Sequence, residues 1–375
     1  MIIGTVTEPG DGESRVALTP DSVKRLRHLG ANVEIESGAG NRSGYSDADY
    51  EQAGAEIQGD RHELLGKANL MLQVQPPTVD DLHRRRDRGI QIGFLNLFEA
   101  HPRVTEMAER NLSGISMELI PRITRAQKMD ALSSQANLAG YVSVIVAAER
   151  LNKIFPMMMT AAGTIAPARV FVIGAGVAGL QAIATAKRLG ARVDAYDTRP
   201  EVEEQVKSVG GRFVKIDLGE TGQTKDGYAK ALSEEQIRQQ RETMKEICAQ
   251  ADVVITTAQV FGRRAPVLVT EPMLEAMKPG SVVVDLAVES GGNVEGIVRD
   301  EVVDRNGVQL VGYANLPGRV PAHASQMYAA NLVALIEEFW NADTRTFVID
   351  PSDEIMKSCL ITHEGDIVNE RFKNL

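Results

Sequence analysis

One segment, residues 168–198, constrains the fold more than any other part of this 375-residue chain. An apolar run at 169–173 leads into Gly-Ala-Gly-Val-Ala-Gly at 174–179, and a helix-like stretch and a second apolar run ending at Asp197 follow. This order predicts a strand, a tight turn, a helix and a second strand, which together make one unit of a doubly wound parallel sheet.

Each glycine of this turn has its own physical role. Gly174 allows the tight turn out of the strand, Gly176 lets the backbone approach a pyrophosphate, and Gly179 lets the helix pack closely on the sheet. The helix N-terminus then offers unpaired N–H groups to the phosphates. A glycine fingerprint alone is weak evidence, but one between a buried strand and a helix is strong, so the turn predicts a dinucleotide site.

The end of the second strand predicts which dinucleotide binds. Asp197 is placed to accept hydrogen bonds from a ribose 2′-OH, and its charge would repel a 2′-phosphate, which favours NAD(H) over NADP(H). Arg199 lies close enough to soften that preference. A methyl-donor nucleotide site and a glycine-rich turn with a surface aspartate are the alternatives. The candidate cofactor-binding residues are Gly174, Gly176, Val177, Gly179, Asp197, Thr198, Arg199 and Tyr228.

The composition is that of a soluble globular protein with room for two cores: 43% of its residues are hydrophobic and 25% are charged. A net charge of -10 argues against nucleic acid as a partner. The two cysteines have no metal-like or disulfide spacing, which favours a reduced, cytoplasmic protein, and no metal site is expected. The longest apolar stretches, such as 142–148, are shorter than the roughly 20 residues of a membrane helix, and no secretion signal is recognisable at the N-terminus.

Strand and helix signals alternate along the chain, which predicts an α/β fold of two Rossmann-like domains with parallel sheets and an interdomain cleft. We expect the first domain to span 1–132 plus 321–375, and the dinucleotide-binding domain to span 133–320. The expected strands are 1–7, 31–36, 68–74, 90–96, 169–173, 191–197, 212–216, 253–256, 281–286 and 308–313, and the main helices follow Thr19, Ser133, Gly176, Thr270 and Val320.

The segment 218–234 breaks this pattern, since it is polar, punctuated by glycine and long for a connection inside a compact domain. Tyr228 is its only aromatic residue, so it is either a lid that closes with that ring against a bound nucleotide or an idle surface loop. A second segment, Met157–Met159, is expected in the core or in a dimer contact, because methionine fills irregular gaps.

Several motifs together resemble one family. Arg-Ala-Gln-Lys-Met-Asp at 125–130, Phe-Pro-Met-Met-Met-Thr-Ala-Ala-Gly at 155–163, the glycine turn and Asp-Leu-Ala-Val-Glu-Ser-Gly-Gly-Asn at 285–293 resemble the NAD(H)-binding domain I of proton-translocating (Re/Si-specific) nicotinamide nucleotide transhydrogenase. The resemblance covers nearly the whole chain, and the motif at 125–130 is much more specific than the glycine fingerprint. It implies that Arg122, Gln127, Asp130 and Ser133 contact the nicotinamide and its ribose, and are the catalytic candidates.

Without the resemblance, Asp130 and Ser133 would be read as a polar cap at a helix start. With it, Gln127 is placed to bridge toward the nucleotide of a partner protein. A hydride passing directly between two nicotinamide rings needs orientation and close approach, and it needs no general acid or base.

Alanine dehydrogenase is a related family that shares Glu8, Glu13 and Arg15. That family holds and protonates its keto acid with a lysine and a histidine, whereas the matching strand ends here carry Gln75 and Asn96. Neither amide side chain is a proton donor of useful pKa, so a keto-acid reduction would lack its general acid. We therefore expect Arg15 to make a structural ion pair.

The sequence thus predicts the NAD(H)-binding subunit of a proton-translocating transhydrogenase, which passes hydride to NADP(H) held by a β-subunit domain. A membrane-spanning subunit would couple the reaction to proton movement, so that this chain is cytoplasmic and peripheral to the membrane through its partners. The resemblance also implies a homodimer. The rivals are an alanine dehydrogenase-like enzyme and a non-catalytic NADH sensor.

Overall fold

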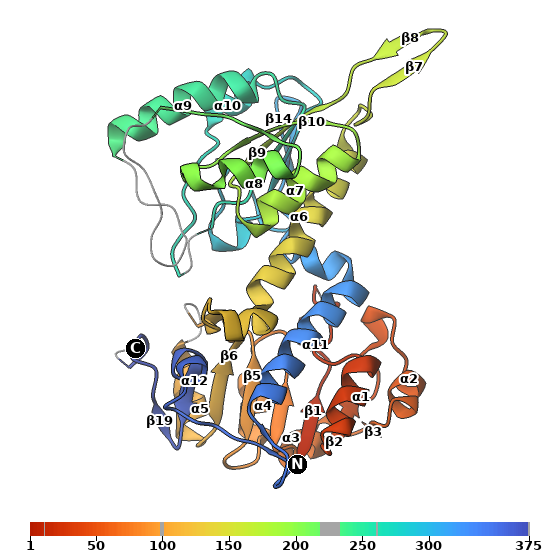
Figure 1. Ribbon diagram of the computed structural model, residues 1–375, viewed down its shortest axis with the longest axis vertical. Helices are drawn as coiled ribbons and strands as arrows, with labels where there is room; N and C mark the ends of the chain where they lie inside the picture. Colours follow the sequence, from red (N-terminus) through yellow and green to blue (C-terminus); the bar gives the residue numbers. More distant parts are fainter. Residues whose placement is uncertain (11, 98–100, 218–232, 260–261, 374–375) are drawn as a thin grey trace. The chain divides into compact units, whose positions relative to one another are not determined.

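The computed structural model describes residues 1–375 except for 11, 98–100, 218–232, 260–261 and 374–375 (Figure 1). The chain divides into two compact units. Unit 1 comprises Met1–Gln135 and Gly318–Leu375, and unit 2 comprises Ala136–Pro317. Because the chain leaves unit 1 and returns to it, the two termini belong to the same unit.

Unit 1 is built on an eight-stranded sheet in the order β19-β18-β6-β5-β4-β1-β2-β3. The strands from β6 to β3 are parallel, whereas β18 and β19 add an antiparallel edge. The strands are β1 (Ile2–Thr5), β2 (Asn32–Glu36), β3 (Glu56–Gln58), β4 (Leu70–Leu72), β5 (Ile90–Gly93), β6 (Ser113–Ser116), β18 (Leu360–His363) and β19 (Asp366–Ile367). Its helices are α1 (Pro20–His28), α2 (Asp47–Gln52), α3 (Arg61–Lys67), α4 (Val79–Arg84), α5 (His101–Glu109), α11 (Pro321–Glu338) and α12 (Glu354–Cys359), and a short ribbon joins β16 (Trp340–Asn341) to β17 (Thr346–Phe347).

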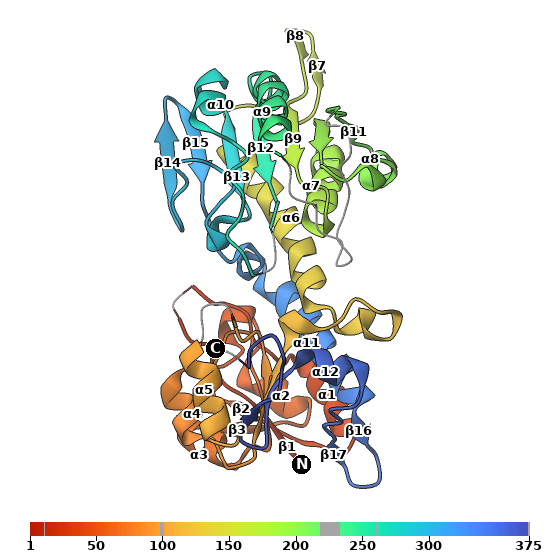
Figure 2. The same ribbon diagram turned by 90° about the vertical axis from the view of Figure 1, so that its left-hand side faces the viewer.

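Unit 2 is built on a seven-stranded sheet in the order β11-β10-β9-β12-β13-β15-β14 (Figure 2). Its strands are β9 (Arg169–Ile173), β10 (Arg192–Tyr196), β11 (Arg212–Phe213), β12 (Val253–Thr256), β13 (Val282–Asp285), β14 (Val302–Arg305) and β15 (Val308–Val311), and its helices are α7 (Val177–Arg188), α8 (Glu203–Ser208), α9 (Glu234–Cys248) and α10 (Glu271–Ala276). All of these pairs are parallel except β14–β15. The strand order reverses at β9, so the chain leaves β9 at a topological switch point, where ligands of such sheets bind.

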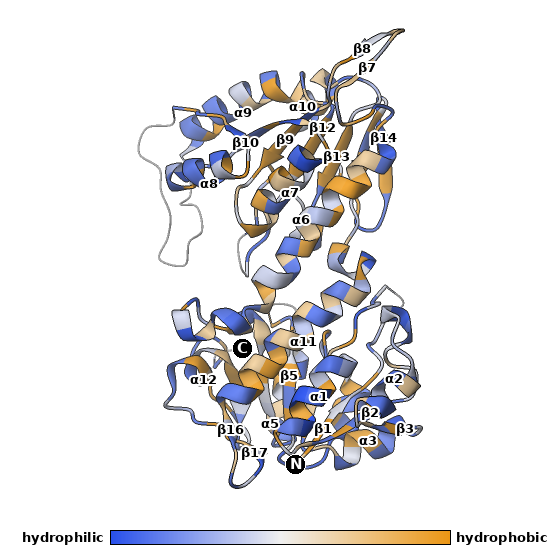
Figure 3. Ribbon diagram, turned by 45° about the vertical axis from the view of Figure 1, so that its right-hand side comes forward, coloured by the Kyte–Doolittle hydropathy of each residue, from blue (hydrophilic) through white to orange (hydrophobic). Residues whose placement is uncertain are grey.

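These sheets confirm the expected α/β class with its mainly parallel strands. The central strands of unit 2 are buried on both faces, as continuous apolar runs in a parallel sheet require, and Figure 3 shows the apolar colour concentrated on β9, β12 and β13. The expected strands did not include β3 and β6 of unit 1 or the antiparallel edge strands β14, β18 and β19.

The start of α1 confirms the expected helix signal. The Ser22 N–H donates to Thr19 Oγ1 at 3.4 Å, and the Thr19 N–H donates to Ser22 Oγ at 2.8 Å, so the two residues cap each other ahead of the first turn. Pro20 occupies the first turn, where its missing N–H has no partner to lose, and Gly30 follows the helix at φ +85°.

The long helix α6 spans Ala131–Arg150, two residues before the start that we expected. A Cβ on Gly140 would lie 2.1 Å from the carbonyl oxygen of Ala178, so glycine is required where α6 crosses the start of α7. By length and composition alone α6 could cross a bilayer, and it is the single such helix among the described residues. That is weak evidence for a span, since a core helix passes the same test, and 44% of the tested stretch is buried within the fold.

The methionine segment is not in the core, so that half of the expectation was wrong. Met158–Thr160 forms β7, which pairs with β8 (Gly163–Ile165) in a two-stranded hairpin that projects from unit 2 (Figure 1). The side chains on this hairpin are exposed: Met159 is 72% and Ile165 51% accessible. The hairpin therefore carries apolar side chains that the core of unit 2 does not bury.

Candidate functional site

The three glycines of the turn differ sharply in the space around them. Gly174 has φ +98°, and a Cβ there would lie 2.5 Å from Thr257 Oγ1. A Cβ on Gly179 would lie 1.9 Å from the carbonyl oxygen of Gly174, so only glycine lets α7 pack this closely on the end of β9. Around Gly176, by contrast, no atom of the described residues lies within 4 Å of the Cβ position apart from those of Gly176 and its two chain neighbours. The first and third glycines are thus needed by the protein's own packing, and the second leaves open space.

The N-terminus of α7 faces this turn. Gly176 is the N-cap residue, and because glycine has no side chain it offers no cap to the first N–H groups of the helix. Val177, the first helical residue, is 42% exposed. An N-terminus of this kind favours an anion through its N–H groups and its dipole.

Asp197 connects the acid at the end of β10 to the glycine turn. Its Oδ2 accepts the Ala175 N–H at 2.8 Å, and Arg199 forms a salt bridge with it from two residues downstream. The Asp197 hydrogen bond raises the pKa of Arg199 above its ordinary value. Thr198 is half-buried between the two. Tyr228, the last of the cofactor-binding candidates, lies outside the described residues.

A second loop system at the same strand ends was not singled out from the sequence as a site. Asn293 is buried; its Oδ1 accepts the Ala258 N–H at 3.0 Å, and its amide donates to the carbonyl oxygens of Ala258 and Pro266. Asp285, at the end of β13, accepts the Asn293 N–H at 2.7 Å, and burial raises the pKa of this carboxyl. The pair ties the loops after β12 and β13 together, and the only signal in the sequence was the motif at 285–293.

In unit 1, the residues that the resemblance assigned to the nicotinamide lie on one continuous segment. Arg122 and Gln127 are exposed, and Gln127 belongs to a 3-10 helix over Thr124–Met129. Asp130 precedes α6, where its carboxylate accepts the N–H and the hydroxyl of Ser133 at 2.9 and 2.6 Å. Asp130 and Ser133 therefore form a helix cap with each other, which is the structural alternative raised by the sequence.

A buried polar cluster lies at the ends of β1 and β4. Arg15 forms a two-point ion pair with Glu13, at 2.8 Å from Nε and 2.7 Å from Nη2, which confirms the structural role expected for this arginine. The amide of Gln75 donates to Glu13 at 2.7 Å. Burial would raise the pKa of Glu13, but its bonds from Arg15 outweigh that effect and hold the pKa below its ordinary value.

Two further glutamates accept backbone N–H groups from the loops at this end of the sheet. Glu8 accepts the N–H groups of Val74 and Gln75, and burial raises the pKa of Glu8 to about 8. Glu118 accepts the N–H groups of Leu95 and Asn96, and burial raises its pKa as well. Gln75 and Asn96, where this chain was expected to depart from alanine dehydrogenase, thus both donate their backbone N–H groups to buried glutamates.

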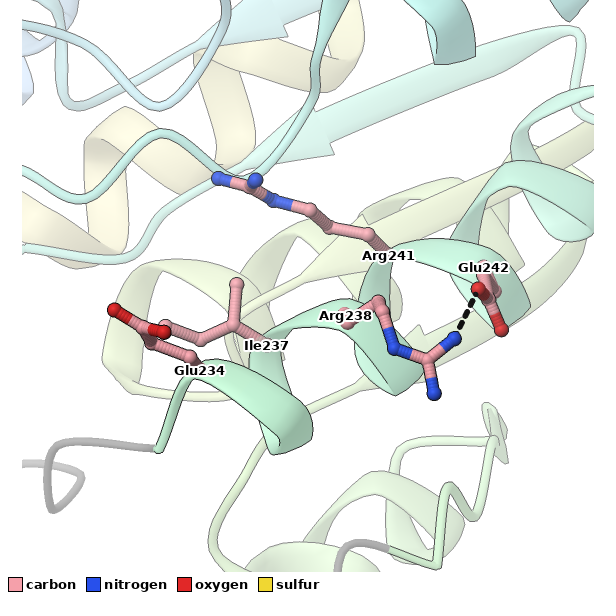
Figure 4. Close-up of a pocket in the computed structure, with 5 residues that line it drawn as sticks. All are labelled: Glu234, Ile237, Arg238, Arg241 and Glu242. Carbon is pink, nitrogen blue, oxygen red and sulfur yellow. Dashed lines mark hydrogen bonds and ion pairs between the residues drawn. The ribbon is translucent and has the colours of Figure 1, made fainter.

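One shallow hollow on the surface of unit 2 lies along a single helix. It is lined by Glu234, Ile237, Arg238, Arg241 and Glu242, all of α9 (Figure 4). Arg238 is paired with Glu242 at 2.8 Å and none of the five residues belongs to the glycine turn, so this hollow adds nothing to the candidate site. Within the described residues, His, Cys, Asp and Glu nowhere gather in threes that could hold a metal ion.

Comparison with known proteins agrees with this arrangement. The alanine dehydrogenase/PNT N-terminal domain matches residues 4–139, and the C-terminal domain of the same family matches residues 143–370. The chain is 43% identical over 376 aligned residues to the first segment of the NAD(P) transhydrogenase subunit alpha of Rhodospirillum rubrum, covering 98% of each chain.

A solved structure described as a transhydrogenase from Sinorhizobium meliloti superposes with a TM-score of 0.87 and 42% identity, covering 99% of this chain and 100% of the other. The alanine dehydrogenase of Mycolicibacterium smegmatis is more distant, at 29% identity over 99% of this chain and 95% of that protein. The chain therefore belongs to the NAD(P) transhydrogenase α-subunit family, within the wider alanine dehydrogenase/PNT group, and is a transhydrogenase component.

Proposed function

We propose that this chain is the NAD(H)-binding component of a proton-translocating transhydrogenase, and that it passes hydride directly between its own nicotinamide and that of NADP(H) on a partner subunit. The observation that carries the proposal is the link between the glycine turn and Asp197, in a chain that is 43% identical to a transhydrogenase α subunit. Open space at Gly176 and an uncapped α7 N-terminus suit a pyrophosphate, and a carboxylate at the end of β10 suits a ribose diol.

For the transfer itself, the proposed residues are Arg122, Gln127, Asp130 and Ser133. Arg122 and Gln127 are both exposed, so a nucleotide can reach this segment from solvent. Asp130 and Ser133 hold each other at the start of α6, and such a pair presents its groups in a fixed orientation. Fixed orientation is what a direct hydride transfer requires, because the reaction gains most from bringing two rings together and needs no proton donor.

The chemistry of the keto-acid positions supports this reading over the alanine dehydrogenase alternative. The Gln75 amide donates a hydrogen bond to Glu13, but an amide cannot give up a proton to a substrate. Arg15, which matches the carboxylate-binding position of that relative, forms an ion pair with the same glutamate. To bind Arg15, a keto acid would have to displace Glu13 from a buried ion pair. It would then meet amide side chains at the place where its reduction needs a general acid.

The proposed partners are an NADP(H)-binding β-subunit domain and a membrane-spanning subunit, with this chain on the cytoplasmic side and held at the membrane through them. A second copy of this chain is also proposed, with the β7–β8 hairpin as the contact. Its exposed Met157, Met158, Met159 and Ile165 form an apolar surface that the core of unit 2 does not bury.

The test is stopped-flow hydride transfer from NADH on the purified chain to an NADP⁺ analogue held by an isolated transhydrogenase NADP(H)-binding domain. Pyruvate with ammonium serves as a parallel acceptor. Rapid transfer only in the presence of the partner domain is the expected result. Oxidation by the keto acid alone would establish the alanine dehydrogenase reading, and binding of NADH without either reaction would establish a sensor.

A further inference from the structure

The Asp197 carboxylate is already saturated by the protein's own donors. Its Oδ1 accepts the backbone N–H and the Nε–H of Arg199, both at 2.9 Å, and its Oδ2 accepts the Ala175 N–H and the Nη2–H of Arg199, both at 2.8 Å. A carboxylate offers about four lone-pair positions, and all of them are used here. The side chain of Asp197 is only 6% exposed and that of Arg199 16%.

Two of these four bonds come from the Arg199 side chain and two from backbone N–H groups. The Ala175 and Arg199 N–H groups belong to the backbone of the turn and the strand end, whereas Nε and Nη2 of Arg199 belong to a guanidinium on a flexible stem. The two N–H groups of the guanidinium, called the fork below, donate one hydrogen bond to each carboxylate oxygen. The vicinal diol of an adenosine ribose would give one O–H to each oxygen, so the fork and the diol compete for the same two acceptor positions.

We propose that Arg199 is a specificity-determining residue of the nucleotide site: its guanidinium occupies the ribose-diol positions of Asp197 in the free protein and is displaced when a dinucleotide binds. The inference rests on the NAD(H) site proposed above. Arg199 then lowers the affinity for NAD(H), because each binding event must break a two-point ion pair that the protein makes with itself.

Displacement also leaves a cation beside the ribose. Asp197 alone would exclude a 2′-phosphate by repulsion, whereas a guanidinium released next to it offers that phosphate a charge-assisted partner. Arg199 therefore reduces the ratio of NAD(H) affinity to NADP(H) affinity in two ways. It competes with the ribose diol of NAD(H), and it offers a partner to the 2′-phosphate of NADP(H). The chain discriminates between the two dinucleotides less sharply than an unpaired aspartate would.

The experiment measures the Kd of NADH and of NADPH by isothermal titration calorimetry for the full chain and for two variants. Arg199→Ala removes both the fork and the charge, so NADH should bind about 3- to 10-fold more tightly and NADPH about 5-fold more weakly. Arg199→Lys keeps the cation but loses the fork, so it should gain NADH affinity while keeping NADPH affinity within about 2-fold.

Arg212→Ala is the matched control. Arg212 makes the same kind of two-point pair with Asp194 one strand away, at 2.6 and 2.8 Å, but on an exposed surface outside the turn. Its removal should leave both Kd values unchanged. An NADH affinity that falls or stays constant in Arg199→Ala would overturn the inference alone, whereas no NADH binding by the unaltered chain would overturn the proposed function and the inference with it.

Discussion

Gly179 and Gly174 approach so closely that a single methyl group on the first would lie 1.9 Å from the carbonyl oxygen of the second. Gly176, three residues before Gly179, has no described residue within 4 Å of its Cβ position other than its two chain neighbours. Substitution of the two positions should therefore separate folding from nucleotide binding.

Gly179→Ala should destabilise unit 2, because the turn backbone cannot move away without breaking the β9–α7 connection. We expect a loss of about 3 kcal/mol in the free energy of unfolding, measured by chemical denaturation with circular dichroism. Gly176→Ala should unfold at the same denaturant concentration as the unaltered chain but bind NADH about 10-fold more weakly, since its methyl group stands where a pyrophosphate would approach. Equal stability of both variants would contradict this division of roles.

Gln127→Ala should slow hydride transfer to the partner's nucleotide by about 10-fold while leaving the Kd of NADH within about 2-fold. The reason is that Gln127 is exposed on a short 3-10 helix and is proposed to orient the rings instead of supplying binding energy. Single-turnover stopped-flow rates give the first quantity and calorimetry the second. Lys128→Ala, at the exposed neighbouring position, is the control and should change neither. A parallel loss of NADH affinity in Gln127→Ala would argue for a binding role.

Met159→Glu should shift the chain from dimer to monomer, because a carboxylate in the apolar contact proposed for β7 and β8 would lose its hydration. The side chain is 72% exposed, so the fold of a single chain should be unaffected. Light scattering after size exclusion measures the change. Val79→Glu, at a 43% exposed apolar position on α4, is the control and should leave the mass unchanged. A Met159→Glu chain that remains dimeric would place the contact elsewhere.

The free energy of unfolding of unit 1 should fall as the pH rises, because Glu8 loses its proton in the buried site. Its folded pKa of about 8 lies above the ordinary 4.5, so the proton is held more tightly in the folded state. The stabilising contribution is complete below about pH 4.5, declines through the window up to pH 8 and is absent above it, with an amplitude on the order of 5 kcal/mol.

The measurement is denaturant unfolding between pH 5 and 9, followed by the fluorescence of Trp340, the only tryptophan of the chain, which donates to the Leu29 carbonyl within unit 1. Glu8→Gln should remove this component of the slope. Glu118, whose pKa is also raised, keeps its own component in both proteins, so the difference between the two curves isolates Glu8. Identical slopes would mean that the folded and unfolded pKa values of Glu8 are the same.

Most strands and helix starts were predictable from the sequence, because their signals depend on residues that are close together in the chain. Strands β9 and β12 have the predicted bounds, and the Thr19 cap with Pro20 placed α1, since an N-cap or a buried apolar run depends on few residues. The antiparallel β18 was not predictable in the same way. It joins β6 at a sequence separation of about 250 residues, where Thr362 donates to Leu112 and receives the Gly114 N–H, and no local pattern encodes such a pairing.

By itself, the sequence determined the glycine turn, the acid at the end of the next strand and the family to which the chain belongs, because each depends on residue identity at fixed spacing. Only the tertiary structure decided what those residues do to one another. It pairs Arg199 with Asp197 and Arg15 with Glu13 in ion pairs. It also places Asp130 and Ser133 in a hydrogen-bonded cap at the start of α6 and leaves the methionine hairpin exposed. Those outcomes depend on which donors and acceptors the packed backbone brings within about 3 Å, and spacing along the chain does not specify that distance.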